Sequence, residues 1–386
     1  MRARGRPGRA GGFAACALLA LPFAAQKSKP VAPPPAVDPY TRGDPDELAR
    51  AGYLTLGPLR FGRDTSQTVQ SHLGDVPMLW VETEHFRLGS SLQEYKPVEP
   101  VEVDELKLEL AELAQTLARV PAKPKKLDPW LRLHLFAQRL ERLHDELNAR
   151  LRLGTTAPDG RKVPLPAMRE KFLVLLTQKK STLARFTSEY CGMEQENSLQ
   201  YYFPDLGTLF FGLSDESIAL GDAELHYALV HGATQNLLRG LNGFLHDLPP
   251  WWGNGLALYF ARTTKPRILL FVKPAGEHLP PEELADWQPL ARGRAEAGAC
   301  VSWKDMLTRE NWNEQPFGDN VVLWSRLDFL LQREGVAPAL TAALHQPVAA
   351  TPDSFAALKS ATGLELEELD RAWRDWVLES YRKKRR

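Results

Sequence analysis

Residues 229–240, LVHGATQNLLRG, have the apolar rhythm of a buried helix with one histidine in its middle. A second apolar helix is expected over 249–262, PPWWGNGLALYFAR, with Pro249 and Pro250 at its start. Helices that are apolar on most sides are stable only inside a sizeable core. A chain of 386 residues with 44% apolar and 25% charged side chains is long enough to provide one.

Short apolar segments before these helices predict a small mixed sheet. Residues 78–88 are rich in aromatic and branched side chains with partial alternation, and 171–177 is a nearly continuous apolar run, typical of a buried strand. Two more strands are expected at 198–203 and 207–213. Helices are expected at 106–117, 127–151 and 182–190, and then in four segments from about residue 318 onward.

The order of these elements predicts the α+β class. An α+β domain with N-terminal strands is expected at 51–262, followed by a mainly helical C-terminal domain at 263–386. The helix at 127–151 has clear start signals, because Asp128 suits its N-cap and Pro129 its first position. His134 and His144 lie on this helix and are assigned no functional role.

Residues 1–25 are expected to be a secretory signal that is not part of the fold. A basic stretch, MRARGRPGRA, precedes the apolar run GGFAACALLALPFAA, and Ala24 and Ala25 offer a cleavage site near Ala25. Lipidation of Cys16 is not favoured, since too few apolar residues precede it. Residues 26–50 are proline-rich and are expected to be a spacer. No later segment reaches the apolar length of a membrane span, so we expect an exported, periplasmic or extracellular protein.

Charge and cysteine content limit the function classes. The 48 lysines and arginines balance 48 aspartates and glutamates, and no nucleic-acid, P-loop, Rossmann or zinc-ribbon motif is present. Nucleic acid is therefore not an expected partner. After removal of the signal the chain keeps Cys191 and Cys300. A disulfide between them would stabilise the fold by about 4–5 kcal/mol in the chain-entropy model. Two free buried thiols are the alternative.

The two apolar helices resemble the zincin-like active-site helices of the secreted gluzincin metallopeptidases, the peptidase-MA-like group with a thermolysin-type H-E-x-x-H motif. In this family the second helix carries a glutamate just before G-L-A. Here VHGATQNLL aligns His231 with the first ligand, and LPPWWGNGLALYF aligns Asn254 with the third, 23 residues later. The resemblance covers about residues 80–380 in the order of elements, and residues 353–377 resemble the helical tail of these proteins.

The resemblance implies a zinc site that this chain has largely lost. Two histidines at i and i+4 and a carboxylate hold zinc, the bound water has a pKa of about 7, and a glutamate takes its proton. Here Gly232 stands in place of the glutamate, Gln235 in place of the second histidine and Asn254 in place of the carboxylate. We therefore expect a vestigial site of His231, Gly232, Gln235 and Asn254, with no catalytic residue, no cofactor and no metal.

Alternatives remain open for this site. A lone histidine on an apolar helix is usually a hydrogen-bonded core residue, and we expect His231 and Gln235 to hydrogen-bond Asn254 or water. His246 and Asp247, in the loop between the helices, could instead fold back and complete a non-standard zinc site with His231. Trp251 and Trp252 are expected in the core and at a cleft wall.

The leading hypothesis is an exported pseudo-metallopeptidase that binds a peptide or protein, or acts as an envelope scaffold. The strand at 207–213 is where such a protein would pair with an extended segment, which needs no metal. One competing hypothesis is a divergent zinc-dependent hydrolase with a non-standard ligand set. The other is a purely structural envelope protein.

Overall fold

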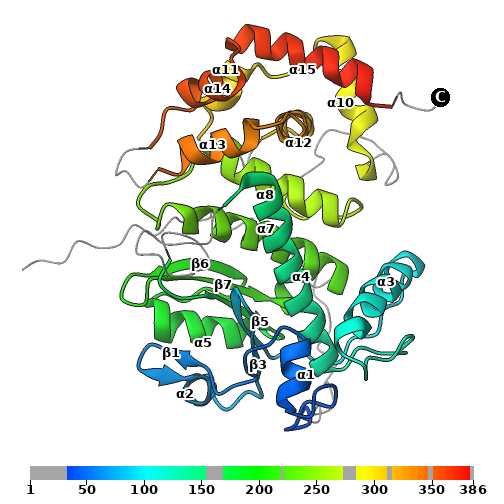
Figure 1. Cartoon of the computed structure of the whole chain (residues 1–386), viewed down its shortest axis with the longest axis vertical. Coiled ribbons are helices and arrows are strands. Elements are labelled where there is room, and N and C mark those ends of the chain that lie inside the picture. The colour runs from blue at the N-terminus through cyan, green and yellow to red at the C-terminus, as the bar shows by residue number, and fades with distance from the viewer. Residues whose placement is uncertain are drawn as a thin grey trace, which may run out of the picture.

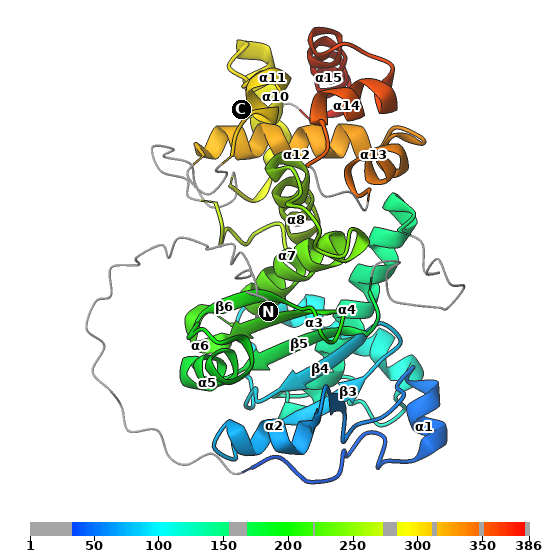
Figure 2. The same cartoon turned by 90° about the vertical axis from the view of Figure 1, so that its left-hand side faces the viewer.

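The computed structural model describes residues 33–153, 168–218, 221–272, 284–310, 315–346 and 351–382. It shows an α+β fold in which helices cover both faces of one small mixed sheet (Figure 1), and helices also make up the C-terminal part (Figure 2). The expected fold class is confirmed. The signal sequence predicted for residues 1–25 lies outside the described residues.

The main sheet has five strands, in the spatial order β3-β4-β5-β7-β6. The two central pairs, β4 with β5 and β5 with β7, are parallel, whereas the outer pairs, β3 with β4 and β6 with β7, are antiparallel. The strands span Leu79–Glu82 (β3), Phe86–Ser90 (β4), Phe172–Thr177 (β5), Ser198–Phe203 (β6) and Thr208–Ser214 (β7). The strands predicted at 171–177, 198–203 and 207–213 are confirmed.

The single strand predicted at 78–88 is wrong, because the chain reverses there into the hairpin of β3 and β4. Thr83 holds the reversal: its backbone N–H donates to Phe86 O at 2.9 Å, and Phe86 N–H donates to its hydroxyl at 3.1 Å. A turn held by a threonine side chain carries no glycine or proline signal, so the alternation continues through it in the sequence.

The central strands are buried on both faces, and their side chains alternate between two hydrophobic clusters. Val174 and Phe211 belong to the larger cluster, and Leu175 and Phe210 belong to the smaller one. The smaller cluster lies under α2 (Ser66–His72) and α5 (Lys180–Cys191), next to the short strands β1 (Arg60–Phe61) and β2 (Asp64–Thr65). The larger cluster is the main core.

Three long helices lie on the other side of the sheet (Figure 2), where the second and third contact its strands and the first packs against the second. They are α3 (Pro100–Thr116), α4 (Pro129–Leu151) and α7 (Asp222–Leu241), with the short α6 (Asp215–Ile218) before α7. As expected, Pro129 is the first residue of α4, and the Asp128 carboxylate accepts from Trp130 N–H at 2.9 Å and Leu131 N–H at 3.1 Å. His134 and His144, on this helix, are both buried.

The C-terminal helices share the main core with the sheet. They are α8 (Pro250–Thr264), α10 (Trp287–Ala297), α11 (Trp303–Leu307), α12 (Phe317–Leu331), α13 (Val336–Leu344), α14 (Ser354–Thr362) and α15 (Leu366–Ser380). One cluster of buried side chains runs from Tyr40 to Tyr381, so the core is continuous across the boundary expected at residue 262. A Cβ atom on Gly255 would lie 3.0 Å from the Leu327 side chain, which shows how closely α8 approaches α12.

The proline-rich segment expected as a spacer at 26–50 belongs to the fold from Asp38 onward. Asp38, Tyr40 and Thr41 are buried, and α1 (Pro45–Arg50) follows. Asp38 pairs with His134 at 3.1 Å, and the Tyr40 hydroxyl donates to Asp128. These anchors are polar and have no apolar period, which is why the sequence pattern misses them.

Cys191 is buried at the end of α5 and Cys300 is half-buried between α10 and α11, and both are free thiols. Burial raises the pKa of Cys191 to about 12, so its thiol stays protonated at neutral pH. No helix among the described residues is long and apolar enough to cross a membrane.

Candidate functional site at helices α7 and α8

Helix α7 carries His231, Gln235 and Arg239 along one line. Residues four apart lie on the same face, so these three side chains follow one another at successive turns. The helix is fixed at its start by Asp222, whose carboxylate lies 2.5 Å from the Arg132 guanidinium, with both side chains buried. Most of its other residues are buried between the sheet, α4 and α8.

Gln235 of α7 contacts Asn254 of α8 directly. The Gln235 side-chain amide, through Nε2, donates to Asn254 Oδ1 over 2.8 Å. The structure thus brings together the two positions that the resemblance aligns with the second and third zinc ligands. The side chains at these two positions are neutral amides, and they are joined by a hydrogen bond.

Strand β6 adds a third amide to this contact. Gln200 Nε2 donates to Gln235 Oε1 at 2.9 Å and to the carbonyl oxygen of Gly232 at 3.0 Å. Arg239 donates to Gln200 Oε1 at 2.9 Å. The result is a chain of hydrogen bonds from Arg239 through Gln200 and Gln235 to Asn254, which we call the amide network.

Sequence reasoning missed Gln200 and Arg239. The signal for Gln200 is a polar side chain at the centre of the predicted strand 198–203, where its neighbours are apolar or aromatic. The signal for Arg239 is its position eight residues after His231, on the same face of the helix.

Gly232 is required by packing against β7. A Cβ atom at this position would lie 2.2 Å from Phe211 Cζ and within 2.7 Å of two further ring carbons. The Phe211 ring is buried and forms part of the main core. The space that a glutamate at position 232 would need is therefore filled by an aromatic ring.

His231 does not join the amide network among the described residues. Its ring is half-buried and packs on Phe271, with 4.4 Å between ring centroids and 38° between planes. Burial lowers the pKa of His231 to about 4, so the imidazole is neutral at pH 7. The expected hydrogen bond from His231 to Asn254 is not present.

His246 and Asp247 lie far from His231. The His246 ring is close to the Asn242 side chain, with 3.2 Å between Nε2 and Nδ2, and it contacts Gln346 O at 3.1 Å. Asn242 follows the last turn of α7, eleven residues after His231, or about 16 Å along a helix. Zinc ligands lie about 2.0–2.2 Å from the ion, so these residues cannot share one with His231.

The side chains at the aligned positions do not fit zinc. Zinc sites use thiolates, imidazoles and carboxylates, and here one imidazole stands beside two amides already bonded to each other. Within the described residues, no group of three or more His, Cys, Asp or Glu side chains has the arrangement of a metal site.

The remaining histidine of α7 and the two tryptophans of α8 make contacts inside the fold. His226 faces away from the amide network, with its Nδ1 3.7 Å from Glu109 Oε1. Trp251 and Trp252 are fully buried, so neither forms the wall of an open cleft. Their indole N–H groups donate to Ser354 Oγ at 3.0 Å and to His345 Nε2 at 2.9 Å.

The sheet edge beside the amide network is β6. The expected pairing strand, 207–213, is wrong for this role, because β7 is paired with β5 on one side and β6 on the other. Strand β7 returns along β6 after a short turn, so the outer edge of β6 stays unpaired within the described sheet.

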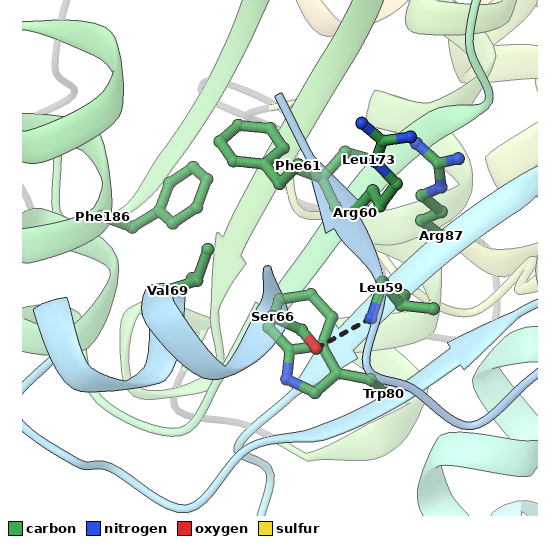
Figure 3. Close-up of a pocket in the computed structure, with 9 residues that line it drawn as sticks. All are labelled: Leu59, Arg60, Phe61, Ser66, Val69, Trp80, Arg87, Leu173 and Phe186. Atoms are coloured by element: carbon green, nitrogen blue, oxygen red, sulfur yellow. Dashed lines mark hydrogen bonds between the residues drawn. The ribbon is translucent and has the colours of Figure 1, made fainter. Parts of the chain in front are cut away.

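A small hollow lies on the opposite face of the sheet (Figure 3). It is largely apolar, and its Ser66 hydroxyl is already used, since it accepts from Leu59 N–H at 3.0 Å. A second shallow hollow lies between α3 and residues 122–127. Neither is lined by a residue of the amide network.

Comparison with protein families and with curated proteins gives no match to this chain, so the gluzincin likeness rests on the motif residues and the order of elements.

Proposed function

We propose that this protein is an exported, catalytically inactive metallopeptidase-like protein that binds an extended peptide or protein segment along the free edge of β6. The observation that carries the proposal is the hydrogen bond between Gln235 and Asn254. It joins the two helices where the resemblance places metal ligands, with groups that neither bind zinc well nor transfer protons at neutral pH.

The loss of catalysis is supported by the packing at Gly232. A general base must lie within hydrogen-bond reach of the water that it activates. Position 232 has no side chain, and Phe211 fills the adjacent space. His231 alone, packed on Phe271, could at most supply one ligand.

The binding role is supported by the geometry of β6. Ser214 N–H donates to Asn197 O, and the hydrogen-bonded pairs of an antiparallel ladder alternate. Ser198, Gln200 and Tyr202 therefore turn their backbone N–H and C=O groups toward the free edge. An edge that no described strand pairs with is a template for an added strand.

Two measurements test this proposal. Purified protein should contain far less than one zinc per chain by elemental analysis and should cleave neither peptide nor ester substrates. Extended peptides should bind, and Ser198→Pro should weaken binding, because proline removes an edge N–H without removing a β6–β7 bond. Ser198→Ala, which keeps the donor, is the matched control. Stoichiometric zinc with peptidase activity would overturn the proposal and favour the divergent hydrolase.

A further inference from the structure

Arg239 is a half-buried cation whose charge is not neutralised by a direct contact among the described residues. Its one hydrogen bond there goes from Nη1 to the neutral Gln200 side chain, and its guanidinium lies over the Phe244 ring at 5.4 Å. Burial lowers the pKa of Arg239, and the exposed Asp247 opposes this shift from beyond ion-pair distance.

Other buried arginines are held by more polar partners than Arg239 is. Arg262 donates to the backbone carbonyl oxygens of Ile268, Leu284 and Ala285, and three more arginines have a carboxylate partner. Arg132 meets Asp222 at 2.5 Å, Arg139 meets Glu109 at 2.5 Å, and Arg326 pairs with Asp370. A charge taken partly out of water without a carboxylate partner is costly. A position near the C-terminal end of α7 offsets only part of this cost, since helix-dipole effects are small.

The position of Arg239 beside Gln200 connects this cation to the sheet edge. The side chain of Gln200 faces α7, whereas those of Leu199 and Tyr201 pack toward the smaller cluster on the other face. In a strand added to β6, the residue opposite Gln200 would point to the same face, with its Cβ about 4.5–5.5 Å away. A carboxylate on that side chain would reach the free donors of the Arg239 guanidinium.

We infer that Arg239 is the recognition residue of this edge, and that the bound segment carries an aspartate or glutamate side chain opposite Gln200. This inference rests on the proposed binding along β6. A planar guanidinium binds a carboxylate through two parallel hydrogen bonds, which gives selectivity as well as affinity. The aromatic rings of Tyr202 and Phe244, stacked at 5.7 Å, lie beside the same site, and the Arg239 guanidinium lies over Phe244.

The test uses the full chain and a positional-scanning library of nonapeptides, acetylated and amidated at their ends. One position is fixed as Asp, Glu, Asn, Gln or Lys, and the others are randomised. Acidic pools should bind at least tenfold more strongly than the matching amide pools at one position. Arg239→Gln should abolish this preference. Arg142→Gln, which removes an equal charge from the exposed pair of Arg142 on α4 and Glu112 on α3, should retain it.

The outcomes separate this inference from the proposed function. Binding without an acidic preference, unchanged in Arg239→Gln, would overturn the role of Arg239 and leave the β6 edge as the binding site. Equal binding of every pool to the wild type and to Ser198→Pro would overturn edge binding itself. A second library with free C-termini completes the test, because an Arg239-dependent preference for the terminal carboxylate alone would overturn the side-chain assignment.

Discussion

Phe211 of β7 occupies the space into which any side chain at Gly232 of α7 would project, since a Cβ there would lie 2.2 Å from its ring. This contact links the sheet to the helix of the candidate site. It also gives a physical reason for the glycine that the motif alone does not provide. A glycine inside a helix costs about 1 kcal/mol relative to alanine, so its presence here reflects packing.

The first prediction concerns this contact. Gly232→Ala should destabilise the protein by about 1–3 kcal/mol, because overpacking outweighs the gain in helix propensity. The matched control is Gly293→Ala on α10, where a Cβ would meet nothing within 4 Å and stability should stay equal or rise. Urea unfolding measures both. In the Phe211→Ala background, Gly232→Ala should cost much less. An equal cost in both backgrounds would show that Phe211 is not the obstacle.

The second prediction concerns the pH dependence of stability. Burial lowers the pKa of His231 to about 4, below the usual value near 6.5, so the folded state disfavours the protonated ring. At pH values between these two pKa values the unfolded chain binds more protons than the folded protein does. The free energy of unfolding therefore falls as the pH drops from about 6.5 to 4. His231→Phe should reduce this acid loss without abolishing it, because burial also lowers the pKa of His345, to about 3.

Urea unfolding at several pH values between 4 and 7.5 measures this effect. An unchanged pH dependence in His231→Phe would show that the ring is not desolvated in solution.

The third prediction tests the place of the N-terminal segment. Burial alone would raise the pKa of Asp38, but the hydrogen bond and charge of His134 outweigh it and lower the pKa. Asp38→Ala should cost about 3–5 kcal/mol, because it removes the carboxylate partner of the buried His134 and leaves the ring with the Tyr53 hydroxyl alone. Asp46→Ala, at an exposed site on α1, should change stability by less than about 0.5 kcal/mol. Equal changes in stability in the two variants would show that residues 38–50 are a spacer and not part of the fold.

The fourth prediction concerns export. The mature chain should start near Gln26, because a basic stretch and an apolar run precede the small residues Ala24 and Ala25. N-terminal sequencing of the protein from envelope or culture fractions decides this. A lipid-modified N-terminus at Cys16 would contradict it, and so would an uncleaved chain that remains in the cytoplasm.

Much of the fold follows from local patterns in the sequence. The apolar runs of β5 and β7 and the capping signals of α4 each produce the element that they predict, because burial and capping act over a few residues. The turn at Thr83 and the buried segment at Asp38 were missed. Both depend on polar contacts whose partners have no fixed spacing in the sequence.

The candidate site was only half predictable. The meeting of Gln235 and Asn254 follows from aligned positions on two helices, and the structure shows it. The contact between Gln200 and Arg239 forms at the strand that ends the sheet. The order of strands in a sheet cannot be predicted from a local sequence pattern. The reason for Gly232 lies in Phe211, a contact between residues 21 positions apart that no periodicity encodes.

The last prediction tests the likeness to a zinc site directly. Gln235→His with Asn254→Glu should create a zinc site together with His231. Positions 231 and 235 lie one turn apart on α7, and position 254 already touches position 235 across the two helices. Three ligands with an open fourth position should bind zinc in the micromolar range or tighter, about 8 kcal/mol or more. Calorimetric titration with zinc measures this.

Each single variant should bind zinc much more weakly than the double variant, and Gln235→His with Asn254→Gln is the matched control that lacks only the carboxylate.

Adding Gly232→Glu should unfold or strongly destabilise the protein unless Phe211→Ala is present, because the glutamate and the ring compete for one space. Hydrolytic activity need not follow even then, since a base and a metal do not replace groups that stabilise the developing oxyanion. A folded double variant that binds zinc no better than the parent would show that the geometry of α7 and α8 is not that of a metal site. His231 would then be a core histidine that packs on Phe271.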